Sequence, residues 1–188
     1  MNLPNKLTLI RIFMIPVFMA LFYLTIIPYN YLISAVVFAL AALTDFLDGY
    51  IARKYNLVTN LGKFLDPIAD KVLVSSALII MLFPYQGAIF PWYAGIGVAI
   101  ILARELVVSG FRMVAASKGM VVAADKSGKV KTFVQDTAII VLLVGASIMP
   151  GVYSIVNIVG LVLFGVSVLL TLYSGVECIV KNREVLKG

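Results

Sequence analysis

The sequence predicts an all-α integral membrane protein with six transmembrane helices in one bundle. Three observations support this prediction: the composition, the spacing of the apolar runs and the distribution of charge. Of the 188 residues, 62% are hydrophobic and 13% are charged, and the mean hydropathy is +1.08. A soluble domain of this length could not bury so much apolar surface, so lipid must be the solvent for most of it.

Apolar runs of about 20 residues define the six expected spans. Turns that contain proline separate them at Pro28, Pro84 and Pro150. Because these turns are short, we expect neighbouring helices to pack antiparallel as a single domain over residues 1–188. The spans are predicted near residues 7–27, 31–53, 64–83, 91–117, 131–149 and 153–180.

Lysine and arginine occur on one side of the predicted bundle. They lie near the N-terminus, around the connections between spans two and three and between spans four and five, and in the C-terminal tail, whereas the other three turns contain neither. By the positive-inside rule, both termini and the two charged connections are cytoplasmic. We expect residues 1–6 to form a short interfacial segment at the start of span one, and the first apolar run lacks the cleavage site of a secretory signal.

The chain contains no histidine and one cysteine, Cys178. This removes the commonest general base and the commonest transition-metal ligand, and it excludes an internal disulfide. Catalysis must therefore depend on carboxylates, lysines, arginines and hydroxyls. The net charge of +6 suits anionic lipid headgroups and phosphorylated substrates. Nucleic acid is not an expected partner, because the basic residues are dispersed among the spans.

Four aspartates, Asp45, Asp48, Asp66 and Asp70, lie at the cytoplasmic ends of predicted spans two and three. Carboxylates in apolar segments cost free energy unless they are paired or bound to a cation. Spacings of three and four residues place each pair on one helix face, and the short connection lets the two faces meet. Oxygen ligands alone select Mg²⁺ or Mn²⁺, and four carboxylates suit two such ions. Ordinary ion pairs with nearby lysines and arginines are the alternative.

Pro67 directly follows the third of these aspartates. Proline cannot lie deep inside a regular helix, because it lacks an N–H and its ring clashes with the preceding turn. We therefore expect Asp66 at or near the first turn of span three, or a kink in the helix at this point.

The residues from Asp45 to Asp70 follow the pattern D-x-x-D-G-x-x-A-R, eight residues, then G-x-x-x-D-x-x-x-D. This pattern resembles the signature of the CDP-alcohol phosphatidyltransferases, and every defined position is present. The resemblance implies that the four aspartates bind a pair of divalent ions and that Asp70 is the general base. It also implies CDP-diacylglycerol as the donor and membrane lipids as the surroundings. The positions that carry over as donor-binding residues are Gly49, Arg53, Thr59, Asn5 and Thr8.

Three further stretches, 2–11, 104–112 and 128–132, are similar to the bacterial family members that join CDP-diacylglycerol to sn-glycerol 3-phosphate. The resemblance implies a homodimer in the bacterial inner membrane with its active site facing the cytoplasm. The phosphate of such an acceptor needs cations besides the metal ions. The predicted phosphate-binding residues are Arg112, Lys126, Lys129 and Lys131.

Arg104 and Glu105 in span four and Asp136 in span five lie deeper in the predicted membrane region. Opposite charges at such depth usually pair within the bundle, so we interpret these residues as structural or supporting groups.

Two alternative functions remain. The first is the same chemistry with another acceptor alcohol, such as inositol phosphate, serine or phosphatidylglycerol, because the Asp45–Asp70 signature is shared by the whole family. The second is a cation carrier whose intramembrane carboxylates bind the transported ion. Against the carrier, the acidic residues cluster at one edge, and the uncharged opposite half offers no exit path.

Overall fold

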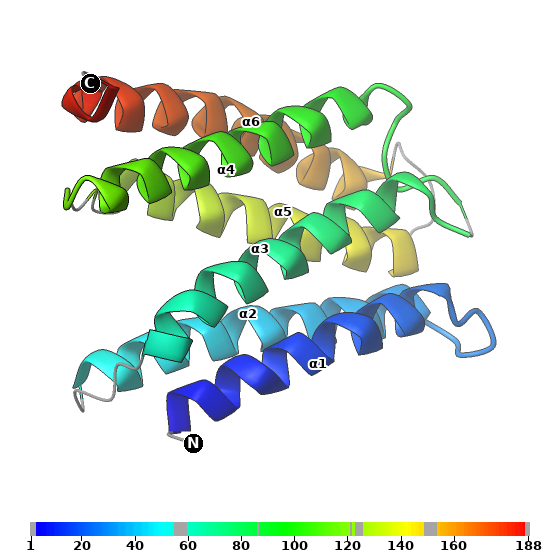
Figure 1. Cartoon of the computed structure of the whole chain (residues 1–188). Coiled ribbons are helices and arrows are strands. Elements are labelled where there is room, and N and C mark those ends of the chain that lie inside the picture. The colour runs from blue at the N-terminus through cyan, green and yellow to red at the C-terminus, as the bar shows by residue number, and fades with distance from the viewer. Residues whose placement is uncertain are drawn as a thin grey trace.

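The computed structural model folds the chain into six long α-helices and a short terminal 3₁₀ helix (Figure 1). The structure describes residues 3–54, 60–85, 87–120, 122, 126–148 and 154–186, without the side chains of 3–5, 46, 48–53, 60, 61, 63, 64, 126 and 186. Every regular element in these ranges is helical. The helices are α1 Leu3–Tyr23, α2 Asn30–Lys54, α3 Asn60–Leu82, α4 Ala94–Ser117, α5 Lys126–Ile148, α6 Ile155–Lys181 and η1 Arg183–Leu186.

The six helices form two halves that meet along α2 and α5 (Figure 1). In one half α1 packs against α2 and α3, and in the other α6 packs against α4 and α5. Figure 1 places both termini at the same end of the bundle, together with the end of α2, the start of α3, the end of α4 and the start of α5. These are the segments that the sequence analysis assigns to one side of the membrane.

Aromatic contacts fix α1 against α2 in the core. The rings of Phe18 and Phe38 lie 5.8 Å apart, and those of Phe22 and Tyr31 lie 4.8 Å apart. All four side chains are buried. Such pairs add to the free energy that apolar burial already contributes, so the position of α1 beside α2 is well determined.

Small residues allow α5 and α6 to approach closely. A Cβ built on Gly160 of α6 would lie 2.7 Å from Cγ of Leu142 on α5 and 3.3 Å from its backbone nitrogen. Leu142 is completely buried and has little room to move. The absence of a side chain at Gly160 is therefore what permits this contact, as is common between helices in membranes.

Within the described residues, four helices contain segments that are long and apolar enough to cross a membrane, namely Lys6–Tyr23, Ala94–Ser117, Ser127–Ile148 and Ile155–Lys181. Large apolar side chains on their outer surfaces are exposed, among them Phe13, Leu106, Phe133 and Leu169. Such surfaces favour lipid over water as the surrounding solvent. In α2 the described apolar stretch is Asn30–Asp45, and most side chains after it lie outside the described residues.

The helix bounds differ from the predicted spans where apolar runs and helices do not coincide. Helix α1 starts at Leu3, so the described residues of the expected interfacial segment are its first turn, and it ends at Tyr23 rather than near 27. Helix α5 starts at Lys126, five residues before the predicted span, because polar residues extend a helix beyond its apolar run.

Helix α3 begins at Asn60, about a turn earlier than predicted. Asp66 therefore lies in the second turn rather than the first, and Pro67 is inside the helix. Because Pro67 lies beyond the first turn, it lacks an N–H that a regular helix would bond one turn back.

The close contact between α5 and α6 predicts the effect of a single methyl group. We expect Gly160→Ala to lower the free energy of unfolding by about 1–3 kcal/mol, because the added Cβ must displace a fully buried leucine. Thermal unfolding in detergent measures the loss. Gly165→Ala on the same helix is the matched control, since a Cβ there meets nothing within 4 Å. Equal melting temperatures for the two variants would contradict the packing described here.

Candidate active site

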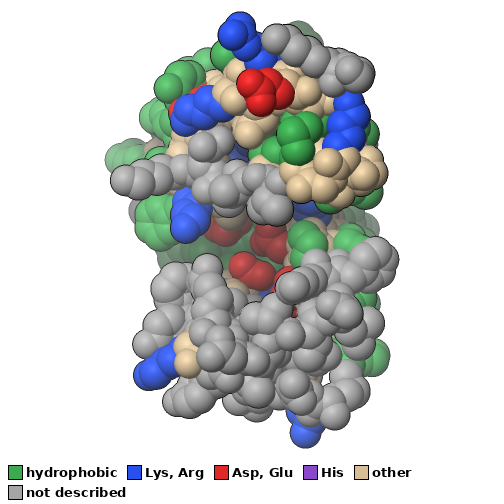
Figure 2. Space-filling view, turned by 60° about the vertical axis from the view of Figure 1, so that its left-hand side comes forward, with side chains coloured by type: hydrophobic (Ala, Val, Ile, Leu, Met, Phe, Trp, Pro, Cys, Tyr) green, Lys and Arg blue, Asp and Glu red, His purple; other side chains and the backbone are tan. Residues whose placement is uncertain are grey.

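Acidic side chains gather in a hollow at the end of the bundle that carries the termini. Figure 2 shows them deep between the two halves of the molecule, with lysine and arginine side chains at several places around them. Asp45 near the end of α2, with Asp66 and Asp70 near the start of α3, come from the half that contains α1. The sequence prediction that these two helices present carboxylates at one end of the molecule is confirmed for these three residues.

Helix α1 holds two of the aspartates directly. Arg11 is completely buried, and its Nη1 donates to Oδ1 of Asp45 at 2.6 Å. Oγ1 of Thr8 donates to Oδ1 of Asp66 at 2.5 Å. Because Thr8 and Arg11 are three residues apart, they lie on one face of α1. Helix α1 thus connects the acidic ends of α2 and α3.

The described carboxylates are close enough to influence one another. Asp45 lies close enough to Asp66 and to Asp70 for their charges to interact, so it repels each of them when both groups are ionised. Among the described residues, no three acidic or cysteine side chains converge closely enough to ligate one metal ion. The side chain of Asp48 lies outside the described residues, so the four-aspartate metal site stays a prediction.

The described donors fit a hard divalent cation. The bonds from α1 occupy Oδ1 of Asp45 and Oδ1 of Asp66. Across the described side chains, Oδ2 of each aspartate accepts no hydrogen bond, which leaves an oxygen on each for another ligand. Oxygen donors of this kind suit Mg²⁺ and Mn²⁺. Asp45, Asp66 and Asp70 therefore offer oxygens of the right kind, although among the described residues they do not converge on one ion.

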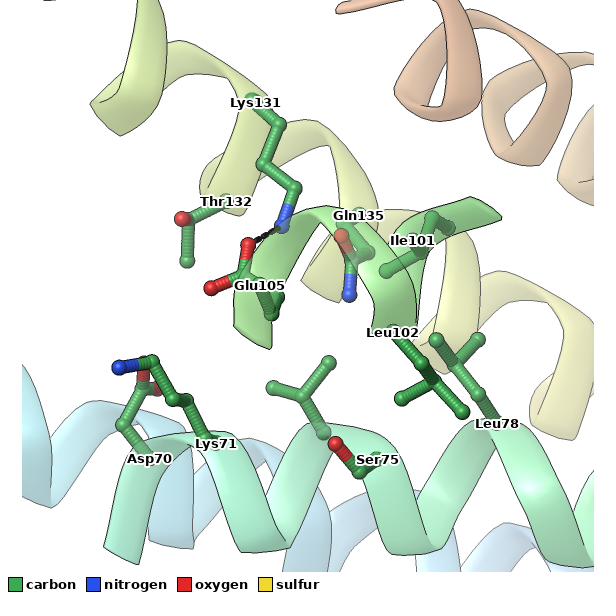
Figure 3. A pocket seen from close by; sticks show the side chains of 11 residues that line it. Asp70, Lys71, Ser75, Leu78, Ile101, Leu102, Glu105, Lys131, Thr132 and Gln135 are labelled. Carbon is green, nitrogen blue, oxygen red and sulfur yellow. Dashed lines mark hydrogen bonds and ion pairs between the residues drawn. The ribbon is translucent and has the colours of Figure 1, made fainter. Parts of the chain in front are cut away.

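Asp70 faces a pocket between α3, α4 and α5 (Figure 3). Opposite it, Nζ of the buried Lys131 donates to Oε1 of Glu105 at 2.6 Å. The pocket thus has a carboxylate from α3 on one side and a carboxylate with a lysine from α4 and α5 on the other. Its lining residues are Asp70, Lys71, Val74, Ser75, Leu78, Ile101, Leu102, Glu105, Lys131, Thr132 and Gln135.

Arg104 extends the ion pair toward α6. Its Nη1 lies 3.0 Å from the same Oε1 of Glu105, and its Nη2 donates to Oγ of Ser174 at 2.8 Å. Gly175 leaves room for this side chain, since a Cβ there would lie 3.0 Å from Cγ of Arg104. Arg104 and Glu105 therefore pair within the bundle, as the sequence analysis predicts.

Asp136 behaves differently from these two residues. Its Oδ1 is buried and has no hydrogen-bond partner within the described ranges, and it makes no ion pair there. The charges of Asp70 and Asp45 act on it from the other half of the molecule. The expected pairing of Asp136 with a cation is not found in the described part of the structure.

The basic residues that were predicted to bind the phosphate of the acceptor do not all lie at this pocket. Lys131 lines it, whereas Arg112 is exposed and lines a separate hollow beside Met120 and Val122. Lys129 is exposed, and the side chain of Lys126 lies outside the described residues. Thr59, which was predicted to bind the donor, lies outside the described residues. For the predicted donor-binding residues Asn5, Gly49 and Arg53, only the backbone is described.

Three residues at this site were not identified from the sequence. Arg11 was not assigned a role at the site, although its spacing from Thr8 places both on one helix face. Gln135 follows Lys131 by four residues, so the same periodicity could have placed it beside that lysine. For Lys71, which lines the pocket next to Asp70, no pattern in the sequence indicated the direction of its side chain.

Comparison with known proteins identifies the family. The family model described as CDP-alcohol phosphatidyltransferase matches residues 1–173. The chain belongs to this family. As a CDP-alcohol phosphatidyltransferase it is a membrane-associated transferase of phospholipid biosynthesis. Asp45, Asp66 and Asp70 are the described aspartates of its signature.

Curated relatives match this phosphatidyltransferase over nearly its whole length. A Bacillus subtilis protein is 44% identical, with 99% of this chain and 97% of the relative covered. A Rickettsia bellii protein is 41% identical over 93% of this chain and 91% of its own. A Salmonella typhimurium protein is 39% identical over 92% and 90%. All three are named CDP-diacylglycerol–glycerol-3-phosphate 3-phosphatidyltransferase.

The contact between α1 and α2 predicts a measurable coupling in this phosphatidyltransferase. We expect Arg11→Met to lower the free energy of unfolding by about 1–3 kcal/mol, less than for a fully buried pair because Asp45 is 41% exposed. Asp45→Asn in the same chain should recover part of this loss, since it removes the charge left without Arg11. Chemical unfolding in detergent of the two single variants and the double variant measures the coupling. Strictly additive losses would contradict the pairing.

Proposed function

We propose that this protein transfers a phosphatidyl group from CDP-diacylglycerol to sn-glycerol 3-phosphate, giving phosphatidylglycerophosphate and CMP. One observation carries the proposal: a single pocket presents Asp70 and Lys131 on opposite sides, beside the acidic hollow. A base and a cation for an anionic acceptor are the two groups that this transfer needs besides charge neutralisation at the donor. The names of the three relatives support the choice of donor and acceptor.

Asp45, Asp48, Asp66 and Asp70 would hold a pair of Mg²⁺ or Mn²⁺ ions. When bound, such ions neutralise charge on the diphosphate of the donor and on the departing CMP. Arg11 and Thr8 support this arrangement, because they fix one oxygen of Asp45 and one of Asp66 before any ligand binds. A pre-formed set of donors loses little conformational entropy when it takes up its ligand.

Asp70 would act as the general base. It takes the proton of the C1 hydroxyl of glycerol 3-phosphate, and that oxygen attacks the phosphorus that bears the diacylglycerol. The bond from this phosphorus to the bridging oxygen breaks, and CMP leaves with the electron pair. The transfer is direct, without a covalent intermediate on the protein. The place of Asp70 in the pocket wall supports this role, since a base must reach the hydroxyl that it deprotonates.

The donor would be bound by Gly49, Arg53 and Thr59 with Asn5 and Thr8 from α1. Thr8 is the member of this set whose side chain is described, and its bond to Asp66 supports a place at the donor site. Arg53 would add positive charge near the diphosphate, where a guanidinium can form paired hydrogen bonds.

Lys131 would hold the phosphate of the acceptor. Its ammonium has three donor hydrogens, so it can keep Glu105 and still bind a phosphate oxygen. Lys71 lines the same pocket and adds a second positive charge. Arg112, Lys126 and Lys129 stay predicted members of this site, for which they would draw the anion toward the membrane edge.

The membrane arrangement is part of the proposal. All six helices would cross a bacterial inner membrane as one domain, with both termini and the active site facing the cytoplasm, and the protein would form a homodimer. The position of both termini at one end of the bundle supports an even number of crossings (Figure 1). The basic connections at that end support a cytoplasmic assignment.

The activity itself is the first test. Purified protein in detergent micelles with CDP-diacylglycerol and Mn²⁺ should release CMP when sn-glycerol 3-phosphate is added. We expect Asp70→Asn to lower kcat by about 10²–10⁴-fold, the usual contribution of a general base, whereas Glu184→Gln at an exposed position should retain the activity. Release of CMP with inositol phosphate or serine in place of glycerol 3-phosphate would move the proposal to another acceptor. Metal flux across vesicles without CMP release would indicate a carrier.

The acceptor site has its own test. Lys131→Met should raise the KM for glycerol 3-phosphate by about tenfold or more and change the KM for CDP-diacylglycerol much less, because a charge-assisted bond to phosphate is lost. Arg112→Ala, measured in the same way, tests whether the separate hollow contributes to acceptor binding. Equal changes of both KM values in Lys131→Met would defeat the assignment of this lysine.

A further inference from the structure

The pocket contains a buried amide with no hydrogen-bond partner. Gln135 is 2% exposed and lines the pocket from α5. Its Oε1 is buried and unpartnered, and its side chain makes no hydrogen bond within the described part of the chain. Buried polar groups nearly always have a partner, and leaving one without a partner costs free energy. The Gln135 amide is therefore placed to bind a polar group that enters the pocket.

A second acceptor lies beside this amide. Both Lys131 and Arg104 bind Oε1 of Glu105, and no described residue donates to Oε2. In Figure 3 the second carboxylate oxygen points away from Lys131, toward the side of the pocket where Asp70 lies. Because two cations already compensate the charge of Glu105, this oxygen is suited to a neutral hydrogen-bond donor rather than to a further cation.

Apolar side chains surround these two groups. Val74, Leu78, Ile101 and Leu102 line the same pocket. A ligand that lacks the matching group leaves the buried amide oxygen unpaired, so a hydrogen bond here discriminates between ligands. A hydroxyl fits both groups, since its hydrogen can be shared between the remaining carboxylate oxygen of Glu105 and the unpartnered amide oxygen of Gln135.

We propose that Glu105 and Gln135 bind the secondary hydroxyl of the acceptor and thereby select a phosphorylated polyol. This inference rests on the proposed function, in which Lys131 holds the phosphate and Asp70 takes the proton of the terminal hydroxyl. The secondary hydroxyl of glycerol 3-phosphate lies on the carbon between the other two groups. The pocket accordingly offers one contact for each polar group of the acceptor: Lys131 for the phosphate, Glu105 with Gln135 for the secondary hydroxyl, and Asp70 for the terminal hydroxyl.

An acceptor without the middle hydroxyl tests this directly. 3-Hydroxypropyl phosphate keeps the phosphate and the terminal hydroxyl of glycerol 3-phosphate but has hydrogen at the central carbon. The wild-type protein should prefer glycerol 3-phosphate in kcat/KM by at least about tenfold, since hydrogen bonds to buried or charged groups contribute factors of about 10–100. In Gln135→Leu the ratio of the two kcat/KM values should fall close to one, because the variant loses a hydrogen bond that only glycerol 3-phosphate makes.

The analogue also reports whether the variant folds. Gln135→Leu should keep its rate with 3-hydroxypropyl phosphate, which needs the same base and the same phosphate contact. Thr137→Val is the matched control on α5, since the Thr137 hydroxyl donates to the backbone oxygen of Phe133 outside the pocket. This control should retain the wild-type preference.

The outcomes separate this inference from the proposed function. A wild-type protein that releases no CMP with glycerol 3-phosphate contradicts the proposed function itself. Wild-type activity without a preference for glycerol 3-phosphate over the analogue overturns only the hydroxyl site. An equal loss with both acceptors in Gln135→Leu, or an equal loss of preference in Thr137→Val, also overturns the hydroxyl site.

Discussion

The arrangement of this phosphatidyltransferase depends on how an apolar bundle carries several carboxylates at one end. Asp45 interacts electrostatically with Asp66 and with Asp70, and ionised carboxylates in such a position repel each other unless cations offset them. The chain supplies one cation itself, the buried Arg11 of α1, at 2.6 Å from Asp45. Thr8, one turn earlier, binds Asp66. The position of α1 against both α2 and α3 therefore serves the acidic hollow as well as the core.

In the half of the bundle formed by α4, α5 and α6, the acidic residue Glu105 is paired with basic side chains. Glu105 is fully occupied on one oxygen by Lys131 and Arg104, and Ser174 and Gly175 of α6 accommodate the arginine. A compensated ion pair thus faces an incompletely compensated acidic group across the pocket. This asymmetry suits two anionic substrates: one would meet the carboxylates through divalent ions, and the other would meet a lysine directly.

Much of the fold and part of the candidate site could be predicted from the sequence, and the features that were not predicted have physical causes. Composition and apolar runs predicted the six helices, and they placed Asp45, Asp66 and Asp70 near the ends of the second and third of these. Helix bounds were less accurate, because polar residues such as Ser127 continue α5 beyond its apolar run and Pro67 is tolerated inside α3. The contacts of Arg11, Glu105 and Gln135 join residues on different helices. Periodicity gives the face of a helix on which a residue lies but not the neighbouring helix that this face meets. Only the tertiary structure therefore reveals these contacts.

Cation binding by the carboxylates of α2 and α3 is the property on which the proposed chemistry depends most. Titration of the purified protein with Mn²⁺, followed by the electron paramagnetic resonance signal of the free ion, measures it without any turnover. We predict saturable uptake of a pair of ions per chain by the wild type and by Glu184→Gln, and a clear loss of uptake in Asp66→Asn. Absence of saturable uptake in the wild type with CDP-diacylglycerol present, or undiminished uptake in Asp66→Asn, would contradict this account.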